Sequence, residues 1–504
     1  MLTVLQFDCI SSAVMARMLS DGRLTSLAGL RDRGVWHDLE APAPAFAAGV
    51  RHTLHSGLPL EDHGLFYPFQ WSASEQRGYY MDAFPAPTPI WERLGHEQGW
   101  STLSIDPYES RRPAHAPPGT LISGWQLHDR VVLRSWAEPP ATRDRLERLF
   151  GPPEPVDEVF GTHTVSEMLG LRQRLLRAPR RVADAATHLL AVEDHDLAWL
   201  TFCSAHVAGH QFWDLSQLPE DELDDDSTHL LGTALEDIYD EVAAALGRVV
   251  AALPPDGDLM IVSPVGMDVN TSRADMLPGM LEAVLGKAPE AGSSSIWWLR
   301  ASLPSGLRAR VANVLPERAV LDLTARLELR GPVWSETRAF AHPADTQGYI
   351  RLNLQGRERD GIVHPDHADA LLDEIAAGLM TFTDMDGSPA VDSIERVSER
   401  FGDGERSDLL PDLIVRWTAT PATRLTGVRS ERFGTVSRQG VGSGRSGNHT
   451  EDGAWALVVP GSGRAVEPSR TPRLEDVAAT VAAIAGLDTV DLAGEPLLES
   501  TSSA

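Results

Sequence analysis

The segment Leu197-Ala-Trp-Leu-Thr-Phe202, followed by Cys203-Ser-Ala-His206-Val-Ala-Gly-His210, combines a strand pattern with two candidate ligands. Its first six residues are mostly apolar, which is typical of a strand buried on both faces. The two histidines follow at the carboxyl end of that strand, where open α/β sheets place their binding sites. If the chain turns helical there, both side chains share one face and can reach one metal ion. The alternative is a pair of surface or capping histidines, since no glutamate accompanies them as in the HExxH motif.

Strand and helix patterns alternate outward from this segment. They predict an α/β fold with a mainly parallel central sheet and helices on both faces. The predicted strands are Leu2 to Phe7, Val35 to Leu39, Ser101 to Ile105, Leu259 to Val262, Pro411 to Trp417 and Ala454 to Val459. The first predicted helix follows the first strand and runs through Leu30. The others cover Ala47 to His55, Ile90 to Gly95, Thr142 to Phe150, Val165 to Leu190, Leu230 to Leu253 and Leu474 to Ala485.

Length, charge and cysteine content limit the classes of protein. The 504 residues are enough for one large α/β domain with insertions, or for two or three domains. The net charge of −28 repels nucleic acid and anionic membranes, so neither is an expected partner. The N-terminus enters an apolar run without a basic region or a cleavage site, which predicts a cytoplasmic protein without a signal peptide. The two cysteines, Cys9 and Cys203, provide no disulfide framework.

Several stretches, in chain order, resemble the alkaline phosphatase superfamily. The branch they resemble contains predicted phosphohydrolases and phosphomutases related to type I phosphodiesterases and nucleotide pyrophosphatases. Asp8, at the end of the first strand, is similar to that family's first metal ligand. The other stretches that carry the resemblance are Ser56-Gly57-Leu58-Pro59 with His63-Gly64, Ala205 to Trp213, Ser263 to Met267, Trp334 to Arg338, Asn353 to Glu358 with Gly361-Ile362-Val363, Pro411 to Ile414, and Ser446 to Gly453.

The resemblance implies one alkaline-phosphatase-like domain over residues 1–495, followed by a flexible tail at 496–504. Its core is expected at about 1–70, 195–290 and 405–495. Inserted cap elements are expected at about 71–194 and 291–404.

The departures from the family pattern affect its two metal ions and its nucleophile. Counting back from Gly57, as the family motif requires, places Ala47 at the nucleophile, and an alanine cannot form a phosphoryl-enzyme intermediate. The Asp-His pair of the second metal site is replaced by Pro264-Val265, neither of which can bind a metal. The alternative alignment makes Thr53 or Ser56 the nucleophile.

The first metal site is changed rather than lost. His206 replaces its aspartate, whereas His210 and His449 remain, so the resemblance implies one divalent ion held by three histidines. Zinc is expected first, with iron or copper as alternatives. Asp8 is the candidate base or orienting group, and strand-end capping is its alternative.

Two further residues are catalytic candidates. Arg51 and His55 are four residues apart and share a helix face, so they could bind an anionic group or shuttle protons. Surface charge is the alternative for each.

These features predict a metal-dependent, hydrolase-like enzyme in which the three-histidine metal activates water or a small-molecule substrate that can be anionic. One alternative is a redox or lyase-type biosynthetic enzyme that uses iron or copper in the same pocket. The other is a binding protein that keeps the fold of a phosphodiesterase without its catalysis. The oligomeric state is left open.

Overall fold

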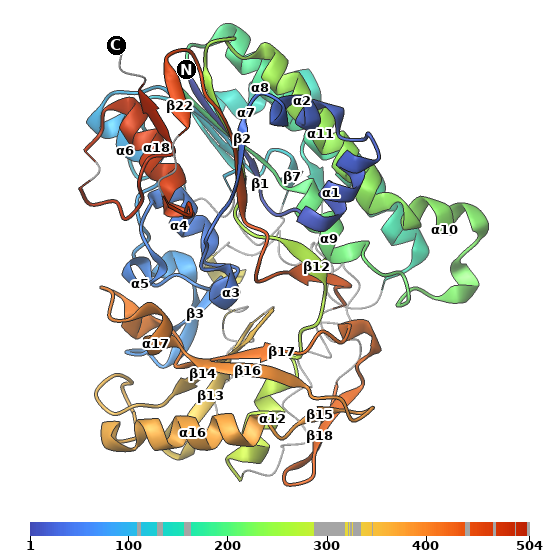
Figure 1. Ribbon diagram of the computed structural model, residues 1–504, viewed down its shortest axis with the longest axis vertical. Coiled ribbons are helices and arrows are strands. Elements are labelled where there is room, and N and C mark those ends of the chain that lie inside the picture. The colour runs from blue at the N-terminus through green and yellow to red at the C-terminus, as the bar shows by residue number, and fades with distance from the viewer. Residues whose placement is uncertain are drawn as a thin grey trace.

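The computed structural model describes residues 1–107, 112–128, 135–155, 163–286, 318–320, 322, 325, 334–344, 346–438, 444–466, 470–488 and 490–500. Strands and helices alternate through these residues, and the predicted α/β class with a mainly parallel central sheet is confirmed. Figure 1 shows this sheet in the upper part of the molecule and a second group of strands in the lower part.

The central sheet has eight strands in the order β2-β21-β11-β1-β10-β5-β6-β8. The five neighbours from β11 to β6 are parallel, and antiparallel pairs occur at the two edges. The bounds are β1 Leu2–Phe7, β2 Val35–Asp38, β5 Thr102–Ile105, β6 Gly119–Ser123, β8 Trp136–Glu138, β10 Leu197–Phe202, β11 Asp258–Ser263 and β21 Trp455–Val459.

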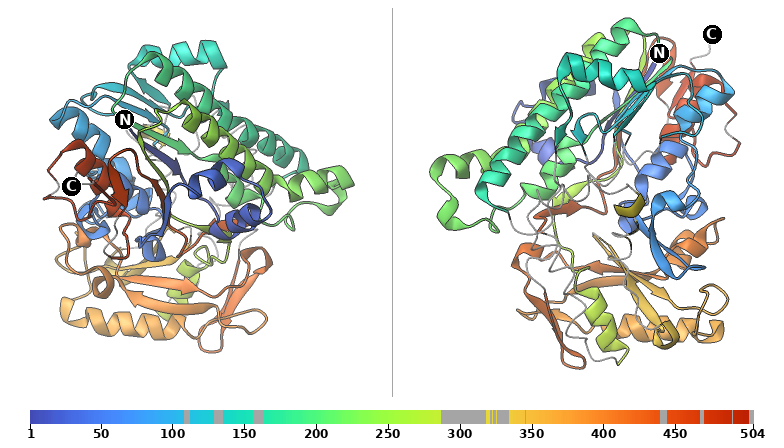
Figure 2. Two further views of the ribbon diagram at one scale, coloured as in Figure 1. Left: turned by 45° about the horizontal axis from the view of Figure 1, so that its top comes forward. Right: turned by 180° about the vertical axis from the view of Figure 1, so that it is seen from behind.

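Helices cover both faces of the sheet, because its central strands are apolar on both sides (Figure 2). In β1, Leu5 and Phe7 belong to one core cluster, whereas Leu2 and Val4 belong to the other. The first cluster is covered by α1 Ser12–Ser20, α2 Thr25–Arg31, α8 Val165–Val192, α9 Ser204–Gln211 and α11 Ala234–Ala252. The second is covered by α4 Val50–Ser56, α6 Ile90–Glu97 and α18 Glu475–Ala485.

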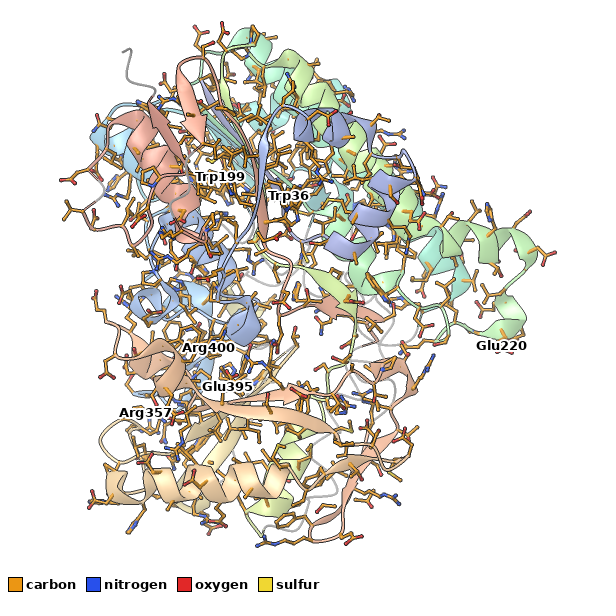
Figure 3. The ribbon with its side chains drawn as sticks, in the orientation of Figure 1. Trp36, Trp199, Glu220, Arg357, Glu395 and Arg400 are labelled. Carbon is orange, nitrogen blue, oxygen red and sulfur yellow. The ribbon has the colours of Figure 1, made fainter. Side chains whose placement is uncertain are left out.

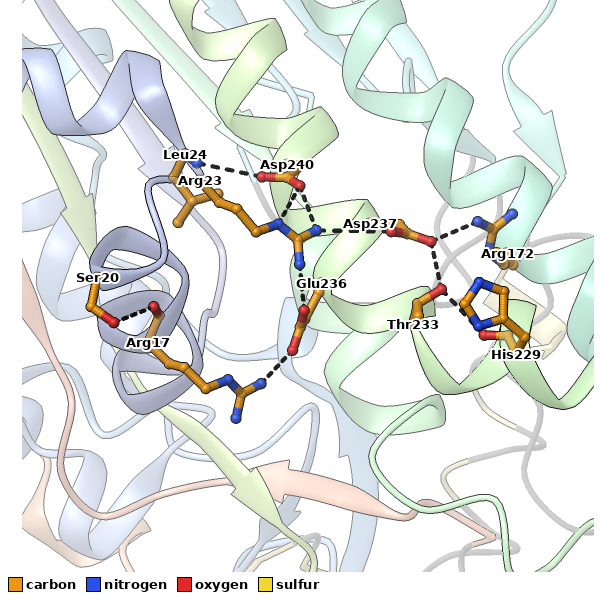
Figure 4. Close-up of polar contacts among 10 residues, drawn as sticks. All are labelled: Arg17, Ser20, Arg23, Leu24, Arg172, His229, Thr233, Glu236, Asp237 and Asp240. Carbon is orange, nitrogen blue, oxygen red and sulfur yellow. Dashed lines mark hydrogen bonds and ion pairs between the residues drawn. The ribbon is translucent and has the colours of Figure 1, made fainter.

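Ion pairs join the helices of the first face (Figure 4). Arg23, in the turn before α2, contacts Glu236 and Asp240 of α11. Arg172 of α8 donates to Asp237 of α11 over 2.7 Å. These contacts lie at the helix surface and align α2 and α8 on the central helix α11, whose apolar side is buried.

Two helical patterns are longer in the sequence than in the structure. The pattern ending at Leu30 is divided into α1 and α2 by a turn in which Gly22 and Leu24 have left-handed φ values of 76° and 51°. The pattern from Leu230 is divided at Thr233 into α10 Asp225–Gly232 and α11. Amphipathic periodicity continues through both breaks, so it does not mark them.

The second group of strands packs below the central sheet. It contains the four-stranded sheet β13-β14-β17-β16 and the three-stranded sheet β15-β18-β19. The bounds are β13 Ala339–His342, β14 Gly348–Leu352, β15 Thr383–Asp384, β16 Val391–Arg396, β17 Leu413–Trp417, β18 Gly427–Ser430 and β19 Gly434–Ser437, with α12 Leu277–Val284 and α16 Ala368–Leu379 packed on them. A separate ribbon, β12 Met267–Val269 paired with β20 Gly447–His449, lies between this group and the central sheet (Figure 1).

The predicted boundaries of core and cap differ from this arrangement. Strands β5, β6 and β8 fall within 71–194, which we predicted as inserted elements, yet they belong to the central sheet. Strands β17 to β19 fall within the predicted core, yet they belong to the lower group. Residues 287–317, which cover the end of the predicted core and the start of the predicted second insertion, lie outside the described residues. In the predicted tail, Leu498–Ser500 forms β23 and pairs with β22 Arg464–Val466, whereas 501–504 lie outside the described residues.

The remaining elements are short or peripheral. The acidic run at Glu220 contains a 3₁₀ turn and the start of α10, and it lies at the outer edge of the molecule (Figure 3). None of the helices in the described ranges combines the length and hydropathy that a bilayer crossing requires. The other bounds are α3 Ala43–Phe46, α5 Leu60–His63, β3 Phe69–Ser72, β4 Arg77–Tyr80, β7 Leu127–His128, α7 Pro140–Phe150, β9 Glu154–Pro155 and α17 Val397–Phe401.

Candidate metal centre

Two of the three candidate ligands are carried by the turn from β10 into α9. The strand ends at Phe202, and the helix begins at Ser204, so His206 and His210 lie one turn apart on α9. Both side chains are buried. The predicted placement of this pair on one helix face, at the carboxyl end of a buried strand, is confirmed.

The third ligand comes from the opposite end of the chain. His449 is the last residue of β20, which pairs with β12 so that His449 faces Met267. The ribbon contacts α9 directly: Ser446, the residue before β20, donates its N–H to the carbonyl oxygen of His210 over 2.9 Å. This contact requires glycine at position 447, where a Cβ atom would lie 2.0 Å from the carbonyl oxygen of Gly209.

The three imidazole rings converge on one point. His206 Nε2 lies 2.8 Å from His210 Nε2 and 2.9 Å from His449 Nε2. The candidate ligand atoms all lie within 4.8 Å of one another. Zn–N bonds of 2.0–2.1 Å in a tetrahedral site imply nitrogen atoms about 3.3 Å apart. The rings would therefore separate by about half an ångström to admit such an ion.

The hydrogen bonds at the far side of two rings fix their tautomers. His206 Nδ1–H donates to Asp8 Oδ2 over 2.5 Å, and His210 Nδ1–H donates to the carbonyl oxygen of Gly447 over 2.9 Å. Each Nε2 atom then presents a lone pair to the cluster. Carboxylate and carbonyl acceptors at Nδ1 are the partners that orient metal-binding histidines in other proteins.

Burial disfavours protonation of two of the three histidines, His210 and His449. Desolvation holds the pKa of His210 well below its usual value, and the charges of Arg445, His206 and His449 lower it further. Burial likewise holds the pKa of His449 well below the usual range, and His206, Arg445 and Arg51 add to this effect while Asp8 opposes it. Lone pairs this close repel each other unless a cation lies between them. One proton can serve only one of the two contacts of His206 Nε2, whereas a metal ion serves all three ligands.

The structure brings Asp8 to this cluster. Asp8 follows β1 directly, and its N–H donates to the carbonyl oxygen of Phe202, which sets it level with the start of α9. Its side chain is almost fully buried, with 2% exposed. Its Oδ2 accepts the hydrogen bond from His206 Nδ1–H, so Asp8 orients that imidazole ring.

Arg51 and His55 lie on one buried face of α4. The charge of Arg51 acts on both His449 and His55, which places it near the three-histidine cluster. His55 packs between Trp91 and Trp199, with ring centroids 4.8 and 5.4 Å away. Its Nε2–H donates to Gln6 Oε1 over 3.1 Å, and burial lowers its pKa to about 3. The alternative of exposed surface charge is wrong for both residues, whereas their catalytic roles stay predictions.

The hydroxyl groups of Thr53 and Ser56, near the expected nucleophile position, form hydrogen bonds with neighbouring residues. Ala47 is buried in the apolar core next to α4. Thr53 Oγ1 accepts from His63 Nε2 over 3.0 Å, because His63 Nδ1 already accepts from Leu65 N–H. Ser56 Oγ donates to the carbonyl oxygen of His52 over 2.6 Å. Val265 lies in the same core as Ala47, and Pro264 beside it is buried.

Searches against models of protein families and against curated protein sequences give no match. Solved structures do match over nearly the full length. Phosphonoacetate hydrolase from Sinorhizobium meliloti 1021, in complex with phosphonoformate, has a TM-score of 0.55 at 13% identity, covering 96% of this chain and 95% of that one. The fold is alkaline-phosphatase-like.

Two murine structures share this likeness. Ectonucleotide pyrophosphatase/phosphodiesterase 5 has a TM-score of 0.51 at 11% identity, covering 98% of this chain and 97% of that one. Its inactive threonine-to-alanine variant, in complex with AMP, has a TM-score of 0.50 at the same identity and coverage. The predicted alkaline-phosphatase-like fold is thus confirmed.

Sequence reasoning missed residues that hold the site in place. Gln126 Oε1 accepts from Cys203 N–H over 3.0 Å, and Gln126 Nε2 donates to the carbonyl oxygen of Thr201 over 2.7 Å, so this side chain clamps the start of α9. Arg445 adds a buried positive charge beside His210. Gln126 carries no motif that could have revealed it. Arg445 directly precedes Ser446-Gly447-Asn448-His449, and that position was the available signal.

Proposed function

We propose that this protein is a metal-dependent enzyme with one divalent ion held by His206, His210 and His449. The convergence of three Nε2 atoms, two of them with their Nδ1–H groups held by Asp8 and Gly447, carries the proposal. A bound ion of this kind lowers the pKa of a coordinated water or polarises a substrate oxygen. Zinc is the first expectation, because three imidazoles and an open position suit it.

The substrate proposed for this site is a small anionic molecule. Three neutral ligands leave the charge of the ion uncompensated, and Arg51 and Arg445 add positive charge around His449. The negative charge of Asp8 opposes these two arginines at His449. The protein as a whole has a net charge of −28, so this local excess of positive charge is specific to the site.

Covalent phosphoryl transfer is absent from the proposed mechanism. Ala47 has no nucleophilic atom, and the hydroxyls of Thr53 and Ser56 are held by His63 and His52. The inactive murine variant, with alanine in place of a threonine, was solved with AMP bound. That structure supports the idea that this fold can keep an anionic ligand after a threonine-to-alanine change has removed its activity. Asp8, beside His206, is positioned to orient the ligand set and to accept a proton.

Metal content separates this function from its alternatives. We would measure bound metals by elemental analysis on untagged protein, beside His206→Ala and the surface control His96→Ala. We expect about one equivalent in the unaltered protein and in the control, and a loss in His206→Ala. Zinc would favour hydrolysis, whereas iron or copper would favour the redox or lyase alternative. Absence of metal after reconstitution would overturn the proposal in favour of the binding protein.

A further inference from the structure

Two buried asparagines hold the ribbon that carries His449. Asn448 directly precedes His449 in β20, and Asn270 directly follows β12, the partner strand. Their side chains contact each other, because Asn448 Nδ2 donates to Asn270 Oδ1 over 3.3 Å. Both residues are only 2% exposed. A buried amide is costly unless its polar atoms find partners, so the partners of this pair show what it holds in place.

The hydrogen bonds of Asn270 fix its amide in one orientation. Its Oδ1 accepts from Ser272 N–H over 2.9 Å, and its Nδ2 donates to the carbonyl oxygen of Arg445 over 2.8 Å. The backbone of Asn270 is held as well, because its N–H donates to the carbonyl oxygen of Ser446 over 2.9 Å and its carbonyl oxygen accepts from Ala422 N–H over 2.6 Å. Asn270 is therefore a fixed point beside the start of β20.

The amide of Asn448 extends this arrangement to the metal ligand. Its Oδ1 accepts from His449 N–H over 2.9 Å and from Thr346 Oγ1 over 3.3 Å, and this places Nδ2 on the side of Asn270. A chain of contacts thus runs from Asn270 through Asn448 to the backbone of His449. Metal–ligand distances tolerate only about 0.2 Å of error, so a backbone shift that carries the imidazole of His449 away would weaken metal binding.

We infer that Asn270 is the positioning residue of the third metal ligand: through the amide of Asn448 it sets the backbone, and hence the imidazole, of His449. The inference rests on the proposed three-histidine site. His206 and His210 lie on one helix, so helical geometry fixes their relation. His449 comes from a separate ribbon and depends on tertiary contacts for its place. Groups that orient a metal ligand typically change metal affinity 10- to 100-fold.

Zinc affinity and the spectrum of bound cobalt test this role. We would compare the unaltered full-length chain with Asn270→Ala, Asn448→Ala and the double variant, and His449→Ala would give the spectrum without the third ligand. Each single change should weaken Zn²⁺ binding 10- to 100-fold in competition with a chelator and shift the Co²⁺ absorption toward that of His449→Ala. The double variant should lose no more than Asn448→Ala alone. Unchanged affinity and spectrum in Asn270→Ala, or additive losses, would overturn the inference.

Asn353→Ala is the matched control. Asn353 is also fully buried, and its Nδ2 donates to the carbonyl oxygens of Trp334 and Thr337 over 2.9 and 3.0 Å, directly after β14 in the lower group of strands. This variant should lose stability as Asn270→Ala does, yet keep the Zn²⁺ affinity and the Co²⁺ spectrum of the unaltered chain. An equal loss of affinity in the control would contradict the positioning role, because general destabilisation would then explain both variants.

Chemical modification of His449 in the metal-free protein tests the contact without any ion. Diethyl pyrocarbonate modifies accessible imidazoles, and peptide mass spectrometry gives the rate at each histidine, with the exposed His96 as reference. His449 should react faster in Asn270→Ala than in the unaltered chain or in Asn353→Ala, with circular dichroism as a check of folding. Equal rates would contradict the inference. If the unaltered chain binds neither Zn²⁺ nor Co²⁺, the proposed function fails, and this measurement still decides whether Asn270 holds His449.

Discussion

His206 Nδ1 lies 2.5 Å from Asp8 Oδ2, and this contact joins the turn after β1 to the helix after β10. The two strands are parallel neighbours, with Phe7 opposite Phe202, so both residues emerge at the same edge of the sheet. The contact directs His206 Nε2 toward His210 and His449. It therefore turns two separate sequence signals, an aspartate after one strand and a histidine after another, into one site.

Asp8→Asn should weaken metal binding without abolishing it. The asparagine oxygen can still accept from His206 Nδ1–H, but it no longer offers a negative charge to that bond. Loss of such an orienting partner typically costs 10- to 100-fold in metal affinity, or about 1.4 to 2.7 kcal/mol. Competition with a chelator of known affinity would measure the change. Unaltered affinity would show that Asp8 does not tune the ligand.

Gly447→Ala should separate the β12–β20 ribbon from α9. The added Cβ would lie 2.0 Å from the carbonyl oxygen of Gly209, which is backbone and cannot move aside cheaply. We expect a lower Tm together with the loss of metal binding, because His449 moves with the ribbon. The matched control is Gly29→Ala in α2, where nothing lies within 4 Å of the added atom. That control should keep or slightly raise Tm, since alanine favours a helix.

Gln126→Leu should destabilise the start of α9. The change leaves Cys203 N–H and the carbonyl oxygen of Thr201 without their side-chain partner in a buried environment. Two unsatisfied backbone groups cost about 2–5 kcal/mol together. Urea unfolding would measure this loss, with Gln98→Leu on the exposed end of α6 as control. Equal stabilities of the two variants would show that water replaces Gln126.

His342 should make the protein less stable in acid. Burial lowers its pKa to about 3, while Nδ1–H donates to the carbonyl oxygen of Pro343 over 2.7 Å. Above pH 6.5 both the folded and the unfolded state hold it neutral, so it adds no pH dependence. Below pH 6.5 the unfolded chain binds the proton and the folded one does not until about pH 3. The free energy of unfolding therefore falls by about 3 kcal/mol between pH 7.5 and 4.5 from this residue.

The variant His342→Asn tests this, because its amide can still donate to Pro343. Urea unfolding at pH 7.5 and 4.5 should show that the variant loses about 3 kcal/mol less on acidification than the unaltered chain does. His96→Asn, on the exposed side of α6, should leave the acid loss unchanged. The same acid loss in His342→Asn would mean that other groups account for it.

The sequence alone determined the elements whose signal is local. Apolar runs identified β1, β10 and β11, because a parallel strand buried on both faces has few polar residues. The four-residue spacing of His206 and His210 predicted their shared helix face, since helical geometry fixes it. Ordered motifs along the whole chain then indicated the alkaline-phosphatase-like fold, which the structure search confirms.

Tertiary structure alone decided what depends on long-range contacts. Residues 206 and 449 meet because α9 and β20 pack through Gly209 and Gly447, and nothing in either segment encodes the distance between them. The strands β5, β6 and β8 belong to the central sheet, although the resemblance implied that they lie in an insertion. The local sequence pattern predicts a strand but does not identify the strand with which it pairs. The sequence does not tell whether His55 is charged. Its burial between Trp91 and Trp199, which lowers its pKa to about 3, shows that it stays neutral. Local periodicity reports the shape of an element, whereas desolvation and charge pairing arise only after distant elements pack together.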